Sequence, residues 1–159
     1  MAAYVPIIID KTTFECLNSR FDVMAGLEGK VVLITGASSG IGAATALHLA
    51  SLGCKLAIVA RSNEKLQDTA DKCKSLGSPD VLVLTQDLSA EGSCENVVEA
   101  TTQHFGGLDV LVNNAGVMYT SNLQKVTSDQ FDHSMNLNVK AAMVSKIFFL
   151  IFSFPLPVN

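Results

Sequence analysis

The segment Lys30–Gly42 reads KVVLITGASSGIG, and the expected architecture of the chain follows from it. Its first part, Lys30–Thr35, is a short, nearly continuous run of β-branched and aliphatic residues, which is typical of a parallel strand buried on both faces. Glycines follow directly, and a helical stretch then runs from Ile41 to Leu52, with Gly53 as its stop signal. The segment therefore predicts a strand, a tight turn and a helix.

The chain repeats this order of strand and helix. Further strands are predicted over residues 55–60, 81–85 and 108–113. Two further helices are predicted to begin at Ser62 and Ser89, and another at a capping box, Thr127–Gln130, from which it continues to about Leu150. Four strands that alternate with four helices predict right-handed βαβ units and a doubly wound parallel sheet of the α/β class.

The glycine turn at 36–42 has the features of an anion site. Glycine reaches backbone angles that a tight turn requires, and it lets the main chain approach a pyrophosphate closely. The unpaired amides and the dipole at the start of the next helix favour a negative charge. A glycine-rich turn that binds nothing is the alternative, but the strand–turn–helix context favours a ligand. The expected contacts are Gly36, Ser38, Ser39, Gly40, Ile41 and Gly42.

Two motifs resemble those of the short-chain dehydrogenase/reductase family. Thr35–Gly42 matches the family's T-G-x-x-x-G-I-G signature, and Asn113–Gly116 matches its N-N-A-G motif at the end of the fourth predicted strand. The resemblance covers residues 27–146. It implies an incomplete Rossmann-like sheet with strand order 3-2-1-4 and an oxidoreductase that transfers hydride between a nicotinamide dinucleotide and a carbonyl or alcohol.

The end of the second predicted strand indicates which dinucleotide is bound. In dinucleotide-binding folds an acidic residue here accepts hydrogen bonds from the adenosine ribose. This chain has Ala60 there, followed by Arg61 and Ser62. A guanidinium can clamp a 2′-phosphate that an acidic group would repel, so Arg61, with Ser62 as a second donor, favours NADP(H) over NAD(H). The alternative is a solvated arginine at a strand end.

The resemblance implies further cofactor contacts. Asp87 and Leu88 match the family's pair that holds the adenine, although Asp87 could also be only a turn residue. Asn114, Ala115 and Gly116 match residues that flank the cofactor ribose; tying the central strand to its neighbours is a second role that the family gives them.

Most of the family's catalytic residues have no counterpart in these 159 residues. The family uses a Ser, an Asn and a Tyr-x-x-x-Lys pair, in which the Lys lowers the tyrosine pKa. Such help is needed because a tyrosine with a pKa near 10 is a poor base at neutral pH. Neither Tyr4 nor Tyr119 has a lysine four residues later. Only the Asn has a match, at Asn138, with Asn136 as the competing choice.

We therefore expect a C-terminally truncated family chain in three parts. Residues 1–23 would be a flexible extension, 24–146 a partial dinucleotide-binding domain, and 147–159 an apolar tail outside the family pattern, too short for a membrane span. The strand at 108–112 would expose an unpaired, aggregation-prone edge. The chain would bind NADP(H) without turnover. A non-catalytic fragment that associates with full-length family subunits is the alternative.

Composition narrows the possible functions and partners. With 159 residues, 48% apolar and 16% charged, the chain is the size of one ordinary globular domain. A net charge of −4 argues against a nucleic-acid partner. The four cysteines have neither disulfide-framework nor metal-ligand spacing, so we expect reduced thiols, no metal site and a cytoplasmic location.

Overall fold

A five-stranded parallel sheet forms the centre of the molecule, which a computed structural model describes over residues 7–10, 26–120 and 123–153. The strands lie in the order β1-β5-β2-β3-β4. Their bounds are Ile7–Asp10 for β1, Val31–Thr35 for β2, Lys55–Ala60 for β3, Val81–Thr85 for β4 and Val110–Asn113 for β5. The predicted doubly wound sheet is confirmed, since the order 3-2-1-4 corresponds to β4-β3-β2-β5.

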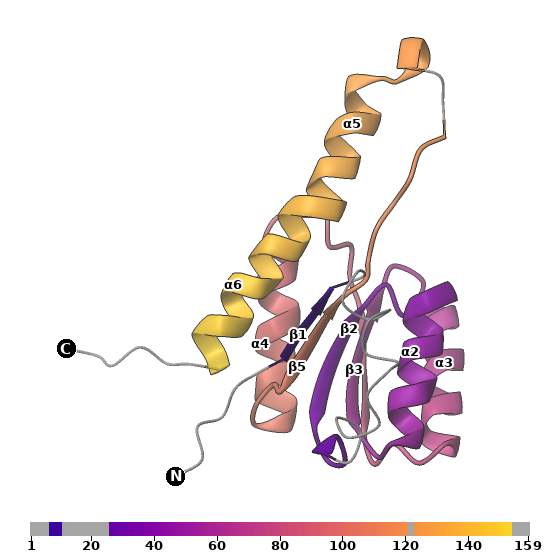
Figure 1. The fold of residues 1–159 in the computed structure, drawn as a ribbon, viewed down its shortest axis with the longest axis vertical. Coiled ribbons are helices and arrows are strands. Elements are labelled where there is room, and N and C mark those ends of the chain that lie inside the picture. The colour runs from indigo at the N-terminus through magenta and orange to yellow at the C-terminus, as the bar shows by residue number, and fades with distance from the viewer. Residues whose placement is uncertain (1–6, 11–25, 121–122, 154–159) are drawn as a thin grey trace, which may run out of the picture.

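Two helical layers cover the sheet (Figure 1). Helices α2 (Gly40–Ser51) and α3 (Asn63–Ser75) lie on one face, and α4 (Ser93–Phe105) and α6 (Ala141–Ser153) lie on the other. Alternate residues of β2 enter opposite cores, with Val32 and Ile34 facing α2 and α3, and Val31 and Leu33 facing α4 and α6. Burial on both faces explains why these strands read as continuous apolar runs in the sequence.

The predicted boundaries of β3 and β4 agree with the structure, but α4 begins four residues later than expected, at Ser93 instead of Ser89. Ser89 is engaged in a turn: its amide and its hydroxyl both donate to Asp87 Oδ1, at 3.0 and 2.7 Å. Local side-chain bonds of this kind compete with helix formation. The predicted capping box at Thr127 is confirmed and opens α5 (Ser128–Met135).

The N-terminal segment supplies an unexpected strand. β1 pairs in parallel with β5, with Ile7 opposite Val110 and Asp10 opposite Asn113. The edge of β5, expected to be unpaired, is therefore covered, and residues 7–10 are not the flexible extension that the sequence suggested. Residues 1–6 and 11–23 of that extension lie outside the described residues.

The C-terminal helix is also longer than predicted. A π-helical turn at Asn136–Lys140 joins α5 to α6, so one helix runs from Ser128 to Ser153. The expected tail boundary at residue 146 is not a structural boundary, because residues 147–153 continue α6 and Phe149 is fully buried. By length and composition alone this helix could cross a membrane, a criterion that core helices of soluble proteins also meet.

Phe149 provides a test of this continuation. Replacing Phe149 by Ala is expected to lower the free energy of unfolding by about 3–5 kcal/mol, because it removes a fully buried ring from the core against α4. Phe152→Ala is the matched control, since that ring is 44% exposed and its loss should cost about 0.5 kcal/mol or less. Urea denaturation measures both. Equal effects would show that residues 147–153 do not pack on the core.

The covered edge can be tested by deletion. A chain lacking residues 1–10 should aggregate more during refolding, because β5 would then present unpaired amides and carbonyls to other chains. A chain lacking only residues 1–6 keeps β1 and should behave as the full chain does. Light scattering at matched concentration compares the two, and indistinguishable scattering would contradict the role assigned to β1.

Candidate functional site

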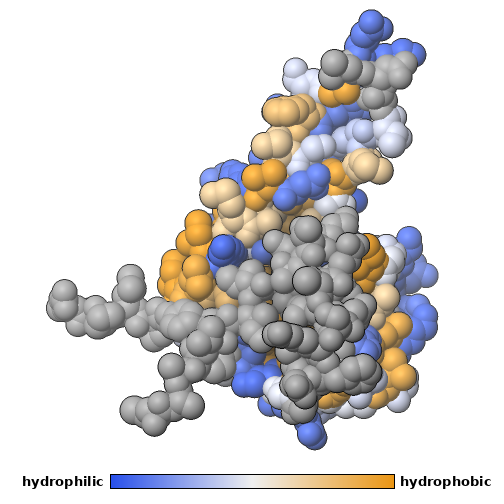
Figure 2. All heavy atoms as spheres, in the orientation of Figure 1, coloured by the Kyte–Doolittle hydropathy of each residue, from blue (hydrophilic) through white to orange (hydrophobic). Residues whose placement is uncertain are grey.

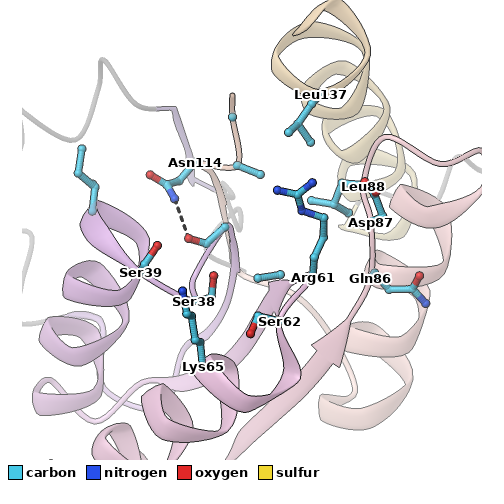
Figure 3. A pocket seen from close by; sticks show the side chains of 15 residues that line it. Ser38, Ser39, Arg61, Ser62, Lys65, Gln86, Asp87, Leu88, Asn114 and Leu137 are labelled. Atoms are coloured by element: carbon cyan, nitrogen blue, oxygen red, sulfur yellow. Dashed lines mark hydrogen bonds between the residues drawn. The ribbon is translucent and has the colours of Figure 1, made fainter. Parts of the chain in front are cut away.

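A cavity of about 490 Å³ opens at the carboxyl ends of the parallel strands. This is where ligands bind in open α/β sheets. Figure 3 shows side chains converging on it from the glycine turn, from the segments after β3, β4 and β5, and from the long helix above. Its lining comprises Gly36, Ser38, Ser39, Ile41, Ala60, Arg61, Ser62, Lys65, Gln86, Asp87, Leu88, Asn114, Ala115, Gly116 and Leu137.

A set of hydrogen bonds fixes the floor of the cavity by joining the ends of β2 and β5. The buried Thr35 hydroxyl accepts from the amides of Asn114 and Ala115, both at 2.9 Å, and donates to the Val112 carbonyl at 3.3 Å. The Asn114 amide nitrogen donates to the carbonyls of Thr35 and Gly36, at 2.9 and 3.3 Å. The two sequence motifs are therefore one connected unit in the structure.

This connection explains two glycines of the turn. Gly36 has a φ of 69°, and an added Cβ would lie 2.9 Å from the Ala115 Cα. An added Cβ at Gly42 would overlap the Gly36 carbonyl and lie 2.5 Å from Asn114 Nδ2. Gly42 is thus required by the close packing of α2 on the turn, and no side chain fits there without displacing Asn114.

Two helices begin at the cavity with hydroxyl side chains that do not cap them. Ser39 precedes α2 and Ser62 precedes α3, and neither side chain makes a capping hydrogen bond. The first turn of α2 also contains no acidic residue. By contrast, Thr127 caps α5 through its side chain. The first amides of α2 and the Ser39 hydroxyl can therefore donate hydrogen bonds to an anion at the start of this helix.

The end of β3 carries positive charge and no acid. Ala60 ends the strand, and Arg61 follows it at an exposed position. In Figure 3 the Arg61 side chain extends into the cavity, with its guanidinium below Leu137. Ser62, next in sequence, also lines the cavity.

Asp87 faces this guanidinium from the segment after β4. Hydrogen bonds from the Ser89 hydroxyl and amide lower the pKa of Asp87, and the charges of Arg61 and His133 act in the same direction. The carboxylate is therefore ionised at neutral pH and remains able to accept further hydrogen bonds. Beside it, Leu88 is 7% exposed and belongs to the core against α4.

Asn138 lies outside the cavity lining, in the π-helical turn. Its side chain pairs with the backbone of Val117: the Val117 amide donates to Asn138 Oδ1, and Asn138 Nδ2 donates to the Val117 carbonyl, both at 2.8 Å. Gly116 passes so close that an added Cβ would lie 3.1 Å from Asn138 Oδ1. In this structure the Asn138 side chain fixes the segment that follows β5.

The cavity brings together most of the residues that the sequence analysis singled out. All thirteen expected cofactor contacts except Gly40 and Gly42 line the cavity, and Gly42 packs directly behind it. Ala60, Lys65, Gln86 and Leu137 also line the cavity and were not among the expected contacts. Lys65 could have been found, because it is three residues after Ser62 in the same helical turn and so shares its end of α3. Leu137 comes from a distant helix and gives no local signal.

The part of the chain that the structure describes contains no group of three or more His, Cys, Asp and Glu residues that could hold a metal ion. Burial raises the pKa of both Cys54 and Cys73 to about 11, so these thiols stay protonated and are poor nucleophiles. Tyr119 stacks edge-on against His133, with ring centroids 6.1 Å apart.

Comparison with known proteins finds dehydrogenases, both by family profile and by sequence identity. The short chain dehydrogenase family profile matches residues 30–149. The 11-beta-hydroxysteroid dehydrogenase A of Sesamum indicum is 50% identical over 121 residues, which are 76% of this chain and 34% of that protein. The chain spans about a third to less than half of the length of such curated relatives.

Solved structures show the same fold. A short chain dehydrogenase from Burkholderia cenocepacia J2315 in complex with NADP has a TM-score of 0.76 and 36% identity, over 80% of this chain and 52% of that chain. The NADH-dependent reductase A1-R′ complexed with NAD has a TM-score of 0.75 and 30% identity, over 81% and 54%. With its two motifs joined in one site, the chain belongs to the short-chain dehydrogenase/reductase family of oxidoreductases.

Proposed function

We propose that this chain binds NADP(H), in preference to NAD(H), as the nucleotide-binding part of a carbonyl or alcohol oxidoreductase. The observation that carries the proposal is the single cavity in which the glycine turn, Arg61, Asp87 and the N-N-A-G segment meet. The NAD and NADP complexes of the two structural neighbours support a nicotinamide dinucleotide as its ligand.

The polar groups of the cavity fit such a ligand part by part. The amides at the start of α2 and Ser39 would hold the diphosphate. Asp87 would accept from the adenine amino group, with Leu88 beside the ring, and the segment Asn114–Gly116 would flank the nicotinamide ribose. When bound, the cofactor would supply or accept the hydride.

The preference for NADP(H) rests on charge at the end of β3. Ala60 offers no carboxylate to bind a ribose hydroxyl or to repel a phosphate, and Arg61 offers up to five donors that suit a phosphate. A single charge-assisted bond to the 2′-phosphate would contribute about 1.5–3 kcal/mol, enough for at least tenfold selectivity.

We further propose that these 159 residues do not by themselves turn over substrate by the family's usual mechanism. The chain contains no Tyr-x-x-x-Lys pair, and Asn138 is the one catalytic position with a match. Both polar ends of the Asn138 side chain are engaged by Val117, so we assign that side chain a positioning role.

A cytoplasmic location also belongs to this proposal; it is supported by free, buried thiols at Cys54, Cys73 and Cys94.

Calorimetry with NADPH and NADH tests the binding. The full chain should bind NADPH at least about tenfold more tightly than NADH. Gly42→Ala should abolish binding of both, because the added methyl group displaces Asn114 and the Gly36 carbonyl. Gly107→Ala is the matched control, since no atom lies within 4 Å of its added Cβ, and it should bind as the unaltered chain does.

Two results would contradict the proposal. No binding of either dinucleotide by folded protein would remove its basis. Sustained oxidation of NADPH by the purified chain with carbonyl substrates, followed at the nicotinamide absorbance band, would overturn the proposed lack of turnover.

A second function is association with full-length family subunits, and an exposed apolar stripe favours it. Met135, Val139, Met143 and Ile147 follow one another at four-residue steps along the helix, and each is 43–59% exposed. They line a shallow groove of about 240 Å³. Figure 2 shows apolar side chains along this projecting helix. Burial against a second subunit would remove this surface from water.

Co-purification with a full-length relative, such as the Sesamum indicum protein, tests the association. Met143→Glu should abolish co-purification, because it places a charge in the middle of the stripe. Leu76→Glu is the control, since Leu76 is 48% exposed but lies at the end of α3, away from the stripe. Equal retention of both variants would exclude this surface.

A further inference from the structure

Lys65 is a cation that lines the cavity and forms no ion pair among the described residues. It lies in the first turn of α3, is exposed, and its side chain lines the cavity. In Figure 3 it extends toward Ser38 of the glycine turn. Its ammonium group makes no hydrogen bond or ion pair with any residue that the structure describes. Lys72 in the same helix, by comparison, pairs with Asp68 at 2.6 Å.

The location of Lys65 in the helix is electrostatically unfavourable. The first turn of a helix carries partial positive charge, so a cation there is repelled and an anion is attracted. Lys72 and Lys74 lie in the last turn of α3, where the helix dipole favours them. Glu64, next to Lys65 in this first turn, matches the helix dipole, but no ion pair joins it to Lys65, so the Lys65 charge remains uncompensated by a direct contact in the described residues.

The neighbours of Lys65 suggest what would compensate this charge. Ser38 and Ser62 also line the cavity, and the Ser62 hydroxyl does not cap α3. Arg61 adds a second cation, but its charge is partly balanced by the carboxylate of Asp87, whose pKa it helps to lower. The corner formed by Ser38, Ser62 and Lys65 thus combines two hydroxyls, an ammonium group and a helix N-terminus, a set that suits a phosphate dianion.

We propose that Lys65 is a second determinant of NADP(H) selectivity, which contacts the 2′-phosphate from the side of the glycine turn while Arg61 contacts it from the end of β3. This inference rests on the proposed binding of NADP(H). It divides recognition of the 2′-phosphate between two cations, one at the end of a strand and one in the helix that follows. Arg61 alone then gives only part of the selectivity.

The test compares Lys65→Gln with Lys65→Arg and with Lys74→Gln in the full chain, by calorimetry with NADPH and with NADH. Lys65→Gln should weaken NADPH binding about tenfold, the effect of losing one charge-assisted contact, and leave NADH binding unchanged within about twofold. Lys65→Arg keeps the charge and should retain most of the NADPH affinity. Lys74→Gln makes the same change in net charge roughly 13 Å further along the helix and should alter neither affinity.

The outcomes separate this inference from the proposed function. If the unaltered chain binds NADPH tightly and Lys65→Gln does too, Lys65 is not a determinant and the cofactor proposal stands. An equal loss of NADPH and NADH binding, or an equal effect of Lys74→Gln, also overturns the inference, because neither depends on the 2′-phosphate contact. If the folded, unaltered chain binds neither dinucleotide, both proposals fail. Circular dichroism on each variant verifies that it is folded, as expected for an exposed side chain.

Discussion

The hydrogen bonds between Thr35 and Asn114 are the constraint on which the rest of the site depends. They hold the carboxyl ends of β2 and β5 side by side. Together with its bonds to Ala115 and Val112, the bond from the Asn114 amide uses the full hydrogen-bonding capacity of the buried Thr35 hydroxyl. Because Asn114 also reaches the Gly36 carbonyl, the glycine turn is fixed to the same point. This leaves no space for a side chain at Gly42. The two family motifs are thus distant in sequence but form one physical unit.

Around this rigid centre, several polar groups are left uncommitted at the cavity. Ser39 and Ser62 stand before helices that they do not cap, while Thr127, far from the cavity, caps its helix fully. Helix termini with unsatisfied amides are stabilised when a ligand supplies the missing partner. The two cations of the cavity differ in the same way, because the charge of Arg61 acts on Asp87, whereas Lys65 makes no ion pair with an acid that the structure describes. The site is therefore organised to receive a polyanion.

The long C-terminal helix joins the site to the surface of the molecule. Its π-helical turn places Asn138 where both ends of its side chain hold Val117, so that helix and cavity loop are coupled. A π-turn inserted in an α-helix is frequent at functional sites. The same helix buries Phe149 against α4 and exposes Met143, so one of its faces packs on the core and another presents apolar side chains to solvent.

The sequence alone predicted four of the five strands, and the family resemblance implied their order and named most of the residues that line the cavity. It could do so because β3 and β4 are continuous apolar runs, and because both family motifs sit at strand ends, which parallel strands bring to one edge. Tertiary structure decided the rest. Contacts between segments far apart in the chain pair Ile7–Asp10 with β5, bury Phe149, and bring Lys65 and Leu137 to the cavity. A side-chain hydrogen bond within a turn delays the start of α4. Periodicity and propensity report only local preferences, so they carry no information about such partners.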